Sequence, residues 1–210
     1  MKWNVPNILT MIRMALTPVV IALFLIPIPK GIGIFVALGI YILACLTDFL
    51  DGYIARKYNQ ITDFGKFMDQ IADKAITTSA MMLVLLGTSI ACPTWLSMVI
   101  VLIVVLRDII LSGIRMVSAN KKIVIAADMF GKVKSFFLDI ASMILMLYIG
   151  LACCLKGGVD AKIGAMPIDY IRYAGLAIMV IGALFSLISL VNYSVNAVKA
   201  IKNQNQTQNV

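Results

Sequence analysis

Residues 47–74 read TDFLDGYIARKYNQITDFGKFMDQIADK and contain two closely spaced pairs of aspartates. Asp48 and Asp51 are three residues apart, and Asp69 and Asp73 are four residues apart. Both spacings place the two side chains of a pair on one face of a helix. If the first pair closes one helix and the second pair opens the next, the four carboxylates converge. They then repel one another unless a cation lies between them.

The composition of the chain predicts an integral membrane protein. Of its 210 residues, 61% are hydrophobic, which excludes an ordinary soluble protein. Apolar runs near twenty residues predict six membrane helices, at residues 9–28, 32–54, 69–90, 93–117, 130–155 and 168–199. We therefore expect an all-α, polytopic six-transmembrane-helix bundle that forms a single domain over residues 1–202.

Both ends of the chain are polar. Residues 1–7 are expected to form an interfacial segment that leads into the first span, because they lack the pattern of a cleaved signal peptide. Residues 203–210 are rich in Asn and Gln, and we expect a disordered tail there.

Lysine and arginine are more frequent in the loops after the second and fourth predicted spans than in the other loops. The positive-inside rule therefore places both termini and the aspartates on the cytoplasmic side of the cell membrane. The net charge of +8 suits anionic lipid headgroups, and no nucleic-acid partner is expected. Small-residue pairs such as Gly182 and Ser186 fit packing within the chain as well as a homodimer seam, so both remain open.

The residue types near the aspartates restrict which metal could bind. The chain has no histidine and no glutamate, and its cysteines (Cys45, Cys92, Cys153 and Cys154) lack metal-ligand spacing. Carboxylate oxygens favour magnesium, manganese or calcium over zinc. The alternative is a network of ion pairs with nearby Arg56, Lys57, Lys66 and Lys74 that only orients the helices. Ionisable clusters inside membranes favour a functional role.

The aspartates belong to a longer pattern, Asp48-x2-Asp51-Gly52-x2-Ala55-Arg56-x8-Gly65-x3-Asp69-x3-Asp73. This pattern resembles the complete signature of the CDP-alcohol phosphotransferase family. The resemblance implies a six-helix membrane fold and two divalent cations, Mg2+ or Mn2+. It also implies transfer of a phosphatidyl group from CDP-diacylglycerol to an alcohol, with release of CMP.

The same resemblance implies roles for the aspartates. Asp48, Asp51 and Asp69 are expected to be the main metal ligands. Asp73 is expected to be the general base for the incoming hydroxyl, and whether it also binds metal is left open.

Four other positions of the pattern are expected to bind the nucleotide part of the CDP-lipid. Gly52 and Ala55 would let the nucleotide lie against the helix, where larger side chains would block it. Gly65 is expected to relieve crowding at the turn between two helices. Arg56 offers its guanidinium donors to a phosphate.

Two further stretches are similar to blocks of the bacterial phosphatidylglycerophosphate synthases within this family. The first is Asn4-Val5-Pro6-Asn7-Ile8-Leu9-Thr10-x2-Arg13, followed by Pro18. It places Asn7 and Thr10 near the nucleotide, although Pro6 and Asn7 also fit a simple helix start. The second is Arg107-Asp108-x3-Ser112-Gly113-x-Arg115 with Gly131-Lys132-x-Lys134-Ser135. Asp108 and Ser135 depart from the Glu and Thr expected there but keep the chemical type.

This similarity implies glycerol 3-phosphate as the acceptor. Its phosphate needs cations near the reacting hydroxyl, and the candidates are Arg107, Arg115, Lys132 and Lys134. The same chemistry with another acceptor, such as inositol phosphate, serine or phosphatidylglycerol giving cardiolipin, is the nearest alternative. A divalent-cation transporter is more distant, because the third and fourth predicted spans carry long apolar runs.

Overall fold

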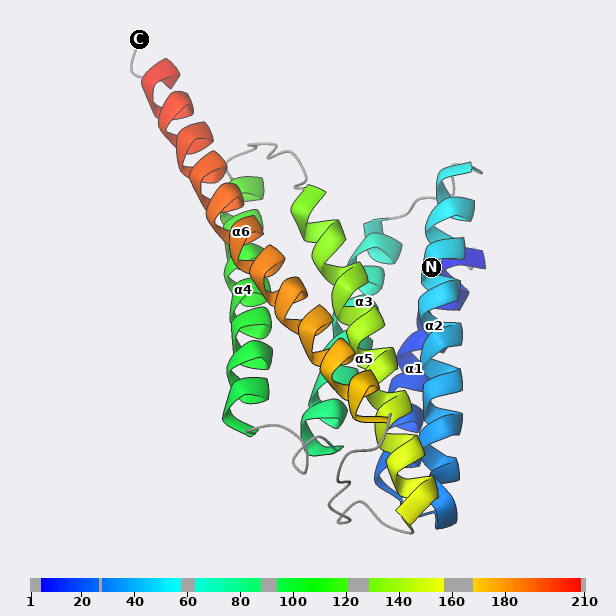
Figure 1. Ribbon diagram of the computed structural model, residues 1–210. Coiled ribbons are helices and arrows are strands. Elements are labelled where there is room, and N and C mark those ends of the chain that lie inside the picture. Colours follow the sequence, from blue (N-terminus) through cyan, green and yellow to red (C-terminus); the bar gives the residue numbers. More distant parts are fainter. Residues whose placement is uncertain are drawn as a thin grey trace.

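The computed structural model describes residues 5–26, 28–57, 63–87, 94–120, 129–156 and 168–208, and they are helical almost throughout (Figure 1). The prediction of an all-helical fold is confirmed for these residues. The elements are α1 (Val5–Leu25), the short 3-10 helix η1 (Pro29–Gly31), α2 (Ile32–Lys57), α3 (Asp63–Gly87), α4 (Thr94–Asn120), α5 (Met129–Lys156) and α6 (Ile168–Gln208).

Three segments of the described residues are long and apolar enough to cross a membrane. They are Ile8–Leu25 in α1, Val133–Leu155 in α5 and Tyr170–Ala200 in α6, and α2 adds the shorter apolar segment Ile32–Asp48. Large apolar side chains also cover the outside of the bundle, with Leu43 at 61% exposure and Leu86 at 62%. Such a surface fits contact with lipid better than contact with water. A count of six spans stays a prediction.

Helix α5 holds the bundle together. It packs most extensively against α6 and also contacts α2 and α3, while α1 packs against α2 and α3, and α4 packs against α6. One apolar cluster of buried side chains takes members from all six helices, including Val20, Tyr41, Met81, Val104, Leu145 and Met179. The described helices therefore share one main core, and a smaller buried cluster joins Ile34 of α2 to Tyr148 and Ile149 of α5.

Small residues allow α5 and α6 to approach closely. A Cβ atom added at Gly182 would lie 2.9 Å from the Leu138 side chain of α5, and Ser186 is completely buried. Next to them the rings of Phe137 and Phe185 stack with centroids 5.6 Å apart. Gly182 and Ser186 are therefore used for packing within the chain, which is one of the two roles left open by the sequence.

Helix α3 begins earlier than predicted. It starts at Asp63, so Asp69 and Asp73 lie inside the helix rather than at its opening. Gly65 lies in the first turn of α3, and the expectation that it sits at a turn between helices is wrong. An acidic residue at the start of a helix is favoured by the helix dipole, and no proline interrupts residues 63–87.

Helix α6 extends further than its apolar part. Residues 203–208 continue the helix where the sequence predicts a disordered tail. Glutamine is a good helix former, and each residue added to an existing helix gains a backbone hydrogen bond at low cost. Residues 209–210 lie outside the described residues.

The end of α2, the start of α3, the end of α4 and the start of α5 lie at the same end of the bundle, uppermost in Figure 1. The C-terminal half of α6 extends toward the same end. Because antiparallel helices alternate their direction, the aspartates of α2 and α3 and the cations of α4 and α5 are gathered there from separate parts of the sequence.

Candidate active site

Arg13 on α1 lies between carboxylates of α2 and α3. Its side chain is 1% exposed, and its Nη1 donates a hydrogen bond to Asp48 Oδ1 and lies 3.5 Å from Asp69 Oδ1. Asp48 and Asp69 therefore converge on one nitrogen, as the prediction of converging aspartates requires. No role was predicted for Arg13, although it ends the amino-terminal motif, three residues after Thr10, which is also buried.

Asp73 lies one turn beyond Asp69 on α3 and interacts electrostatically with both Asp48 and Asp69. We call Asp48, Asp69 and Asp73 the acidic cluster. Arg13 brings one positive charge to these three carboxyl groups, so when all three are ionised the cluster keeps an excess of negative charge. Such a cluster attracts cations.

The donor atoms of the acidic cluster fit a hard divalent cation. Asp69 Oδ1 is buried and accepts no hydrogen bond from the described residues; Arg13 Nη1 pairs with it only at 3.5 Å, so the oxygen can still bind a cation. Among the described side chains, which do not include that of Asp51, no three Asp or Cys residues form a ready metal-binding group. The fit therefore rests on the chemistry of the oxygens and on the convergence of Asp48 and Asp69.

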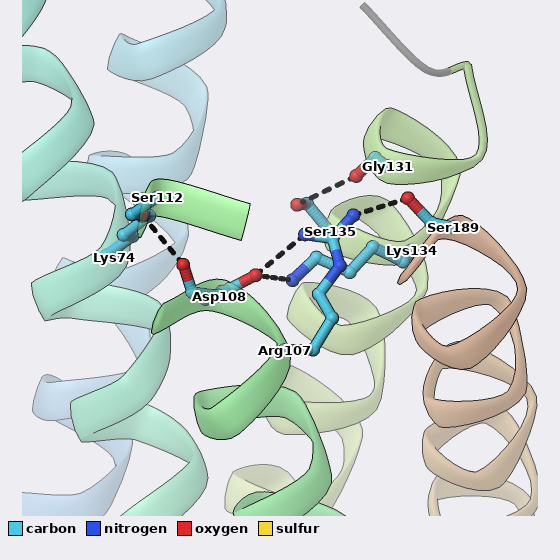
Figure 2. A network of polar contacts seen from close by, with 8 residues as sticks. All are labelled: Lys74, Arg107, Asp108, Ser112, Gly131, Lys134, Ser135 and Ser189. Carbon is cyan, nitrogen blue, oxygen red and sulfur yellow. Dashed lines mark hydrogen bonds and ion pairs between the residues drawn. The ribbon is translucent and has the colours of Figure 1, made fainter. Parts of the chain in front are cut away.

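A second group of charged side chains comes from α4 and α5 (Figure 2). Arg107 Nη1 lies 2.7 Å from Asp108 Oδ1, and Lys134 Nζ lies 2.6 Å from the same oxygen. Arg107 is 7% exposed and Lys134 is 4% exposed. We call Arg107, Asp108 and Lys134 the basic cluster, because two cations share one carboxylate and leave one positive charge. Such a charge suits an anionic ligand.

The acidic and basic clusters lie near each other. Lys74, which follows Asp73 on α3, donates a hydrogen bond of 2.6 Å to Ser112 Oγ on α4. The Ser112 hydroxyl in turn donates to the backbone carbonyl of Asp108. Asp73 also interacts electrostatically with Lys134. A carboxylate of the acidic cluster is thus within electrostatic range of a cation of the basic cluster.

Several residues predicted for the site cannot be placed. Their backbones belong to α1, α2, α4 and α5, but their side chains lie outside the described part of the structure: Asn7, Asp51, Gly52, Ala55, Arg56, Arg115 and Lys132.

A further carboxyl group, that of Asp139, lies between α2, α3 and α5 and belongs to no predicted motif. Asp139 Oδ1 on α5 accepts hydrogen bonds from the Tyr41 hydroxyl of α2 at 2.9 Å and from the Thr77 hydroxyl of α3 at 3.0 Å. Thr77 is one turn from Asp73, and Tyr41 is two turns from Asp48. Asp139 therefore ties together the two helices that carry the aspartates. The signal in the sequence for Asp139 was a single aspartate within the apolar run of the fifth predicted span.

Replacing Asp139 with alanine is expected to lower the stability of the bundle. The Tyr41 and Thr77 hydroxyls would lose their common acceptor, and a buried donor left unpaired costs about 1–3 kcal/mol. Asp139→Asn keeps an acceptor oxygen, so its stability should be closer to that of the wild type. Unfolding curves in detergent would measure the difference. An Asp139→Ala protein as stable as the wild type would show that this bond network does not hold α2 and α3 together.

An apolar helical bundle with a carboxylate cluster and buried cations at one end fits an enzyme that handles phosphate esters at a membrane. The comparisons with known proteins agree. A family model for CDP-alcohol phosphatidyltransferases matches residues 3–188. The chain therefore belongs to the CDP-alcohol phosphatidyltransferase family, and it is an enzyme of that type.

Three similar proteins share one name, CDP-diacylglycerol–glycerol-3-phosphate 3-phosphatidyltransferase. The protein of Bacillus subtilis (strain 168) is 34% identical over 156 residues, which cover 70% of this chain and 78% of the relative. The protein of Rickettsia bellii is 36% identical over 146 residues, or 69% and 75% of the two chains. The protein of Escherichia coli (strain K12) is 30% identical over 195 residues, or 92% and 94%. Both clusters fall within the stretch that the family model matches.

Proposed function

We propose that this chain transfers the phosphatidyl group of CDP-diacylglycerol to glycerol 3-phosphate, giving phosphatidylglycerophosphate and CMP. The names of its relatives describe this reaction. The observation that carries the proposal is the hydrogen-bond link between the two clusters, in which Lys74, next to Asp73, donates to Ser112 Oγ at 2.6 Å and Ser112 donates to the backbone carbonyl of Asp108. It brings a proton acceptor and a phosphate-binding cation to one end of the bundle, and an acceptor with both a hydroxyl and a phosphate needs both.

Two divalent cations, Mg2+ or Mn2+, would be held by Asp48, Asp51, Asp69 and Asp73. The buried Asp69 Oδ1, which accepts no hydrogen bond from the described residues, supports this assignment. When bound, the cations would neutralise the diphosphate of CDP-diacylglycerol and polarise the phosphorus under attack. The Arg13 guanidinium of α1 contacts Asp48 and Asp69 through a common nitrogen, so a bound cation would share or replace this contact.

In the proposed reaction Asp73 acts as the general base. Its carboxylate accepts the proton of the glycerol 3-phosphate hydroxyl as the hydroxyl oxygen attacks the lipid-side phosphorus. The new oxygen–phosphorus bond forms while the bond to the CMP phosphate oxygen breaks, and CMP leaves with its negative charge. In-line displacement of this kind depends on positioning and charge stabilisation, which both clusters can supply.

The remaining residues of the site have binding roles in this proposal. The nucleotide and diphosphate would lie along α1, α2 and α3, against Asn7, Thr10, Gly52, Ala55, Arg56 and Gly65. The acceptor phosphate would be held by cations of α4 and α5: Arg107, Arg115, Lys132 and Lys134. A buried donor supports the second group, because Arg107 Nε makes no hydrogen bond to the described residues. A phosphate oxygen would satisfy it.

We further propose a bundle of six membrane spans within a domain of residues 1–202, with an interfacial segment at residues 1–7. Both termini and the active site face the cytoplasm. The concentration of Lys and Arg in the loops at that end supports this orientation.

An acceptor screen tests the function. Purified protein with CDP-diacylglycerol and Mg2+ is expected to release CMP when glycerol 3-phosphate is added. Release with inositol phosphate, serine or phosphatidylglycerol should be at least about 100-fold slower, because a site built for one acceptor leaves buried polar groups unpaired with another. Faster CMP release with any of these acceptors would refute the assignment of glycerol 3-phosphate. Metal flux into liposomes without CMP release would instead support a transporter.

A further inference from the structure

Helix α6 reaches the basic cluster through Ser189. The side chain of Ser189 is completely buried, and its Oγ accepts a hydrogen bond from Arg107 Nη2 (Figure 2). The two residues are 82 positions apart in the sequence. Ser189 also lies directly after the last residue that the family model matches. Ser189 belongs to none of the predicted motifs.

Gly131 of α5 also lies close to Arg107 Nη2, the nitrogen that Ser189 binds. A Cβ atom added at Gly131 would lie 3.2 Å from Arg107 Nη2 and 3.5 Å from Ser189 Oγ. The first distance is tighter than an ordinary contact, so the absence of a side chain at Gly131 makes room for the guanidinium. Gly131 and Ser189 thus border the head of Arg107 on α5 and α6.

The head of Arg107 is held at two of its three nitrogens. Nη1 is bound by Asp108 Oδ1 at 2.7 Å and Nη2 is bound by Ser189. The third nitrogen, Nε, is buried and has no hydrogen-bond partner among the described residues. Because the guanidinium is planar, two fixed nitrogens fix the direction of the remaining N–H donors. A flexible arginine would instead lose conformational freedom each time it binds a ligand, and this entropy cost would weaken binding.

We propose that Ser189 is a positioning residue for the acceptor: its hydroxyl fixes the Arg107 guanidinium so that the remaining donors meet the phosphate of glycerol 3-phosphate. This proposal rests on the proposed function in one respect, which is that Arg107 binds the acceptor phosphate. It gives the α6 helix a part in substrate recognition beyond its packing against α5. The selectivity is for the acceptor, because Ser189 contacts the basic cluster.

The test compares two serines of α6. Ser189→Ala removes the bond to Arg107 and is expected to raise the KM for glycerol 3-phosphate about tenfold, since hydrogen bonds to charged groups are among the stronger ones. The KM for CDP-diacylglycerol should stay within about twofold by the same reasoning, because no bond on that side is lost. Ser186→Ala is the matched control. Ser186 is equally buried, one turn away, and its hydroxyl makes no hydrogen bond to the described residues.

Three results would overturn the proposal. They are an unchanged KM for glycerol 3-phosphate in Ser189→Ala, an equal rise in the KM for both substrates, and the same change in Ser186→Ala. If Ser189→Ala does not fold, Gly131→Ala decides the question from α5. Its added methyl would press on Arg107 Nη2 and should raise the same KM selectively. An unchanged KM in a folded Gly131→Ala protein would then count against the proposal.

Arg107→Gln separates this inference from the proposed function. If Arg107→Gln leaves the KM for glycerol 3-phosphate unchanged, Arg107 does not bind the acceptor and the proposed function of the basic cluster fails. If Arg107→Gln raises this KM while Ser189→Ala does not, only the role of Ser189 is wrong. If both raise it, the double variant should be no worse than Arg107→Gln alone, because residues that act through one contact are not additive.

Discussion

Replacing Asp73 with asparagine is expected to lower kcat by about 10²- to 10⁴-fold, the usual contribution of a general base. Asparagine has nearly the same shape as aspartate but cannot accept the proton of the incoming hydroxyl. Asp73 lies one turn from Asp69, a proposed metal ligand, and next to Lys74, which donates a hydrogen bond to Ser112 beside the basic cluster. The measurement is the rate of CMP release at saturating CDP-diacylglycerol and glycerol 3-phosphate.

A matched substitution controls for the lost charge. Asp169→Asn removes one aspartate from the first turn of α6, at the opposite end of the bundle, and should leave kcat unchanged. Unfolding curves in detergent would show that the Asp73→Asn protein is folded. If that folded protein keeps a kcat within about tenfold of the wild type, a loss smaller than general bases supply, Asp73 is not the base.

Replacing Asp69 with asparagine is expected to weaken divalent-metal binding by at least about 100-fold. Changes to residues that only support a metal ligand already weaken binding 10- to 100-fold, and a direct ligand should matter no less. The substitution removes the negative charge beside the buried Oδ1 that accepts no hydrogen bond from the described residues. A titration with Mn2+, in which electron paramagnetic resonance detects the free ion, measures the affinity without depending on activity.

The control for metal binding is again Asp169→Asn, which should bind Mn2+ as the wild type does. The titration also tests the part played by Arg13, whose guanidinium contacts Asp48 and Asp69. Because a cation and the guanidinium compete for the same oxygens, Arg13→Gln should not weaken Mn2+ binding as strongly as Asp69→Asn. Equal Mn2+ affinity in the wild type and in Asp69→Asn would remove Asp69 from the proposed ligands.

Much of the fold could be predicted because it depends on local properties. Runs of apolar residues predict helices wherever they are long enough, and the start of α2 at Ile32 and of α6 at Ile168 agree with the predicted spans. Helix ends were harder to predict where polar residues continue a helix. The start of α3 at Asp63 and the end of α6 at Gln208 both extend into polar sequence, where hydropathy has no signal but helix propagation continues.

The candidate site also contains residues that the sequence could predict and contacts that it could not. Asp48, Asp69 and Asp73 could be predicted because residues three or four apart share a helical face, and the structure brings Asp48 and Asp69 to one nitrogen. Arg107 and Lys134 could be predicted from their motifs, but their common partner Asp108 was expected only as a neighbour in sequence. The contacts of Asp139 with Tyr41 and Thr77 join three helices, and no short spacing describes them.

The amino-acid sequence by itself determined that this protein is an apolar helical bundle and that its aspartates and cations follow the pattern of the CDP-alcohol phosphatidyltransferase family. Those properties depend on the composition and on spacings of a few residues. Only the tertiary structure decided that Arg13 joins Asp48 to Asp69, and that Ser189 of α6 binds Arg107 of α4. The physical reason is that these side chains meet across helices far apart in the chain, and the packing of the helices alone sets which of them meet.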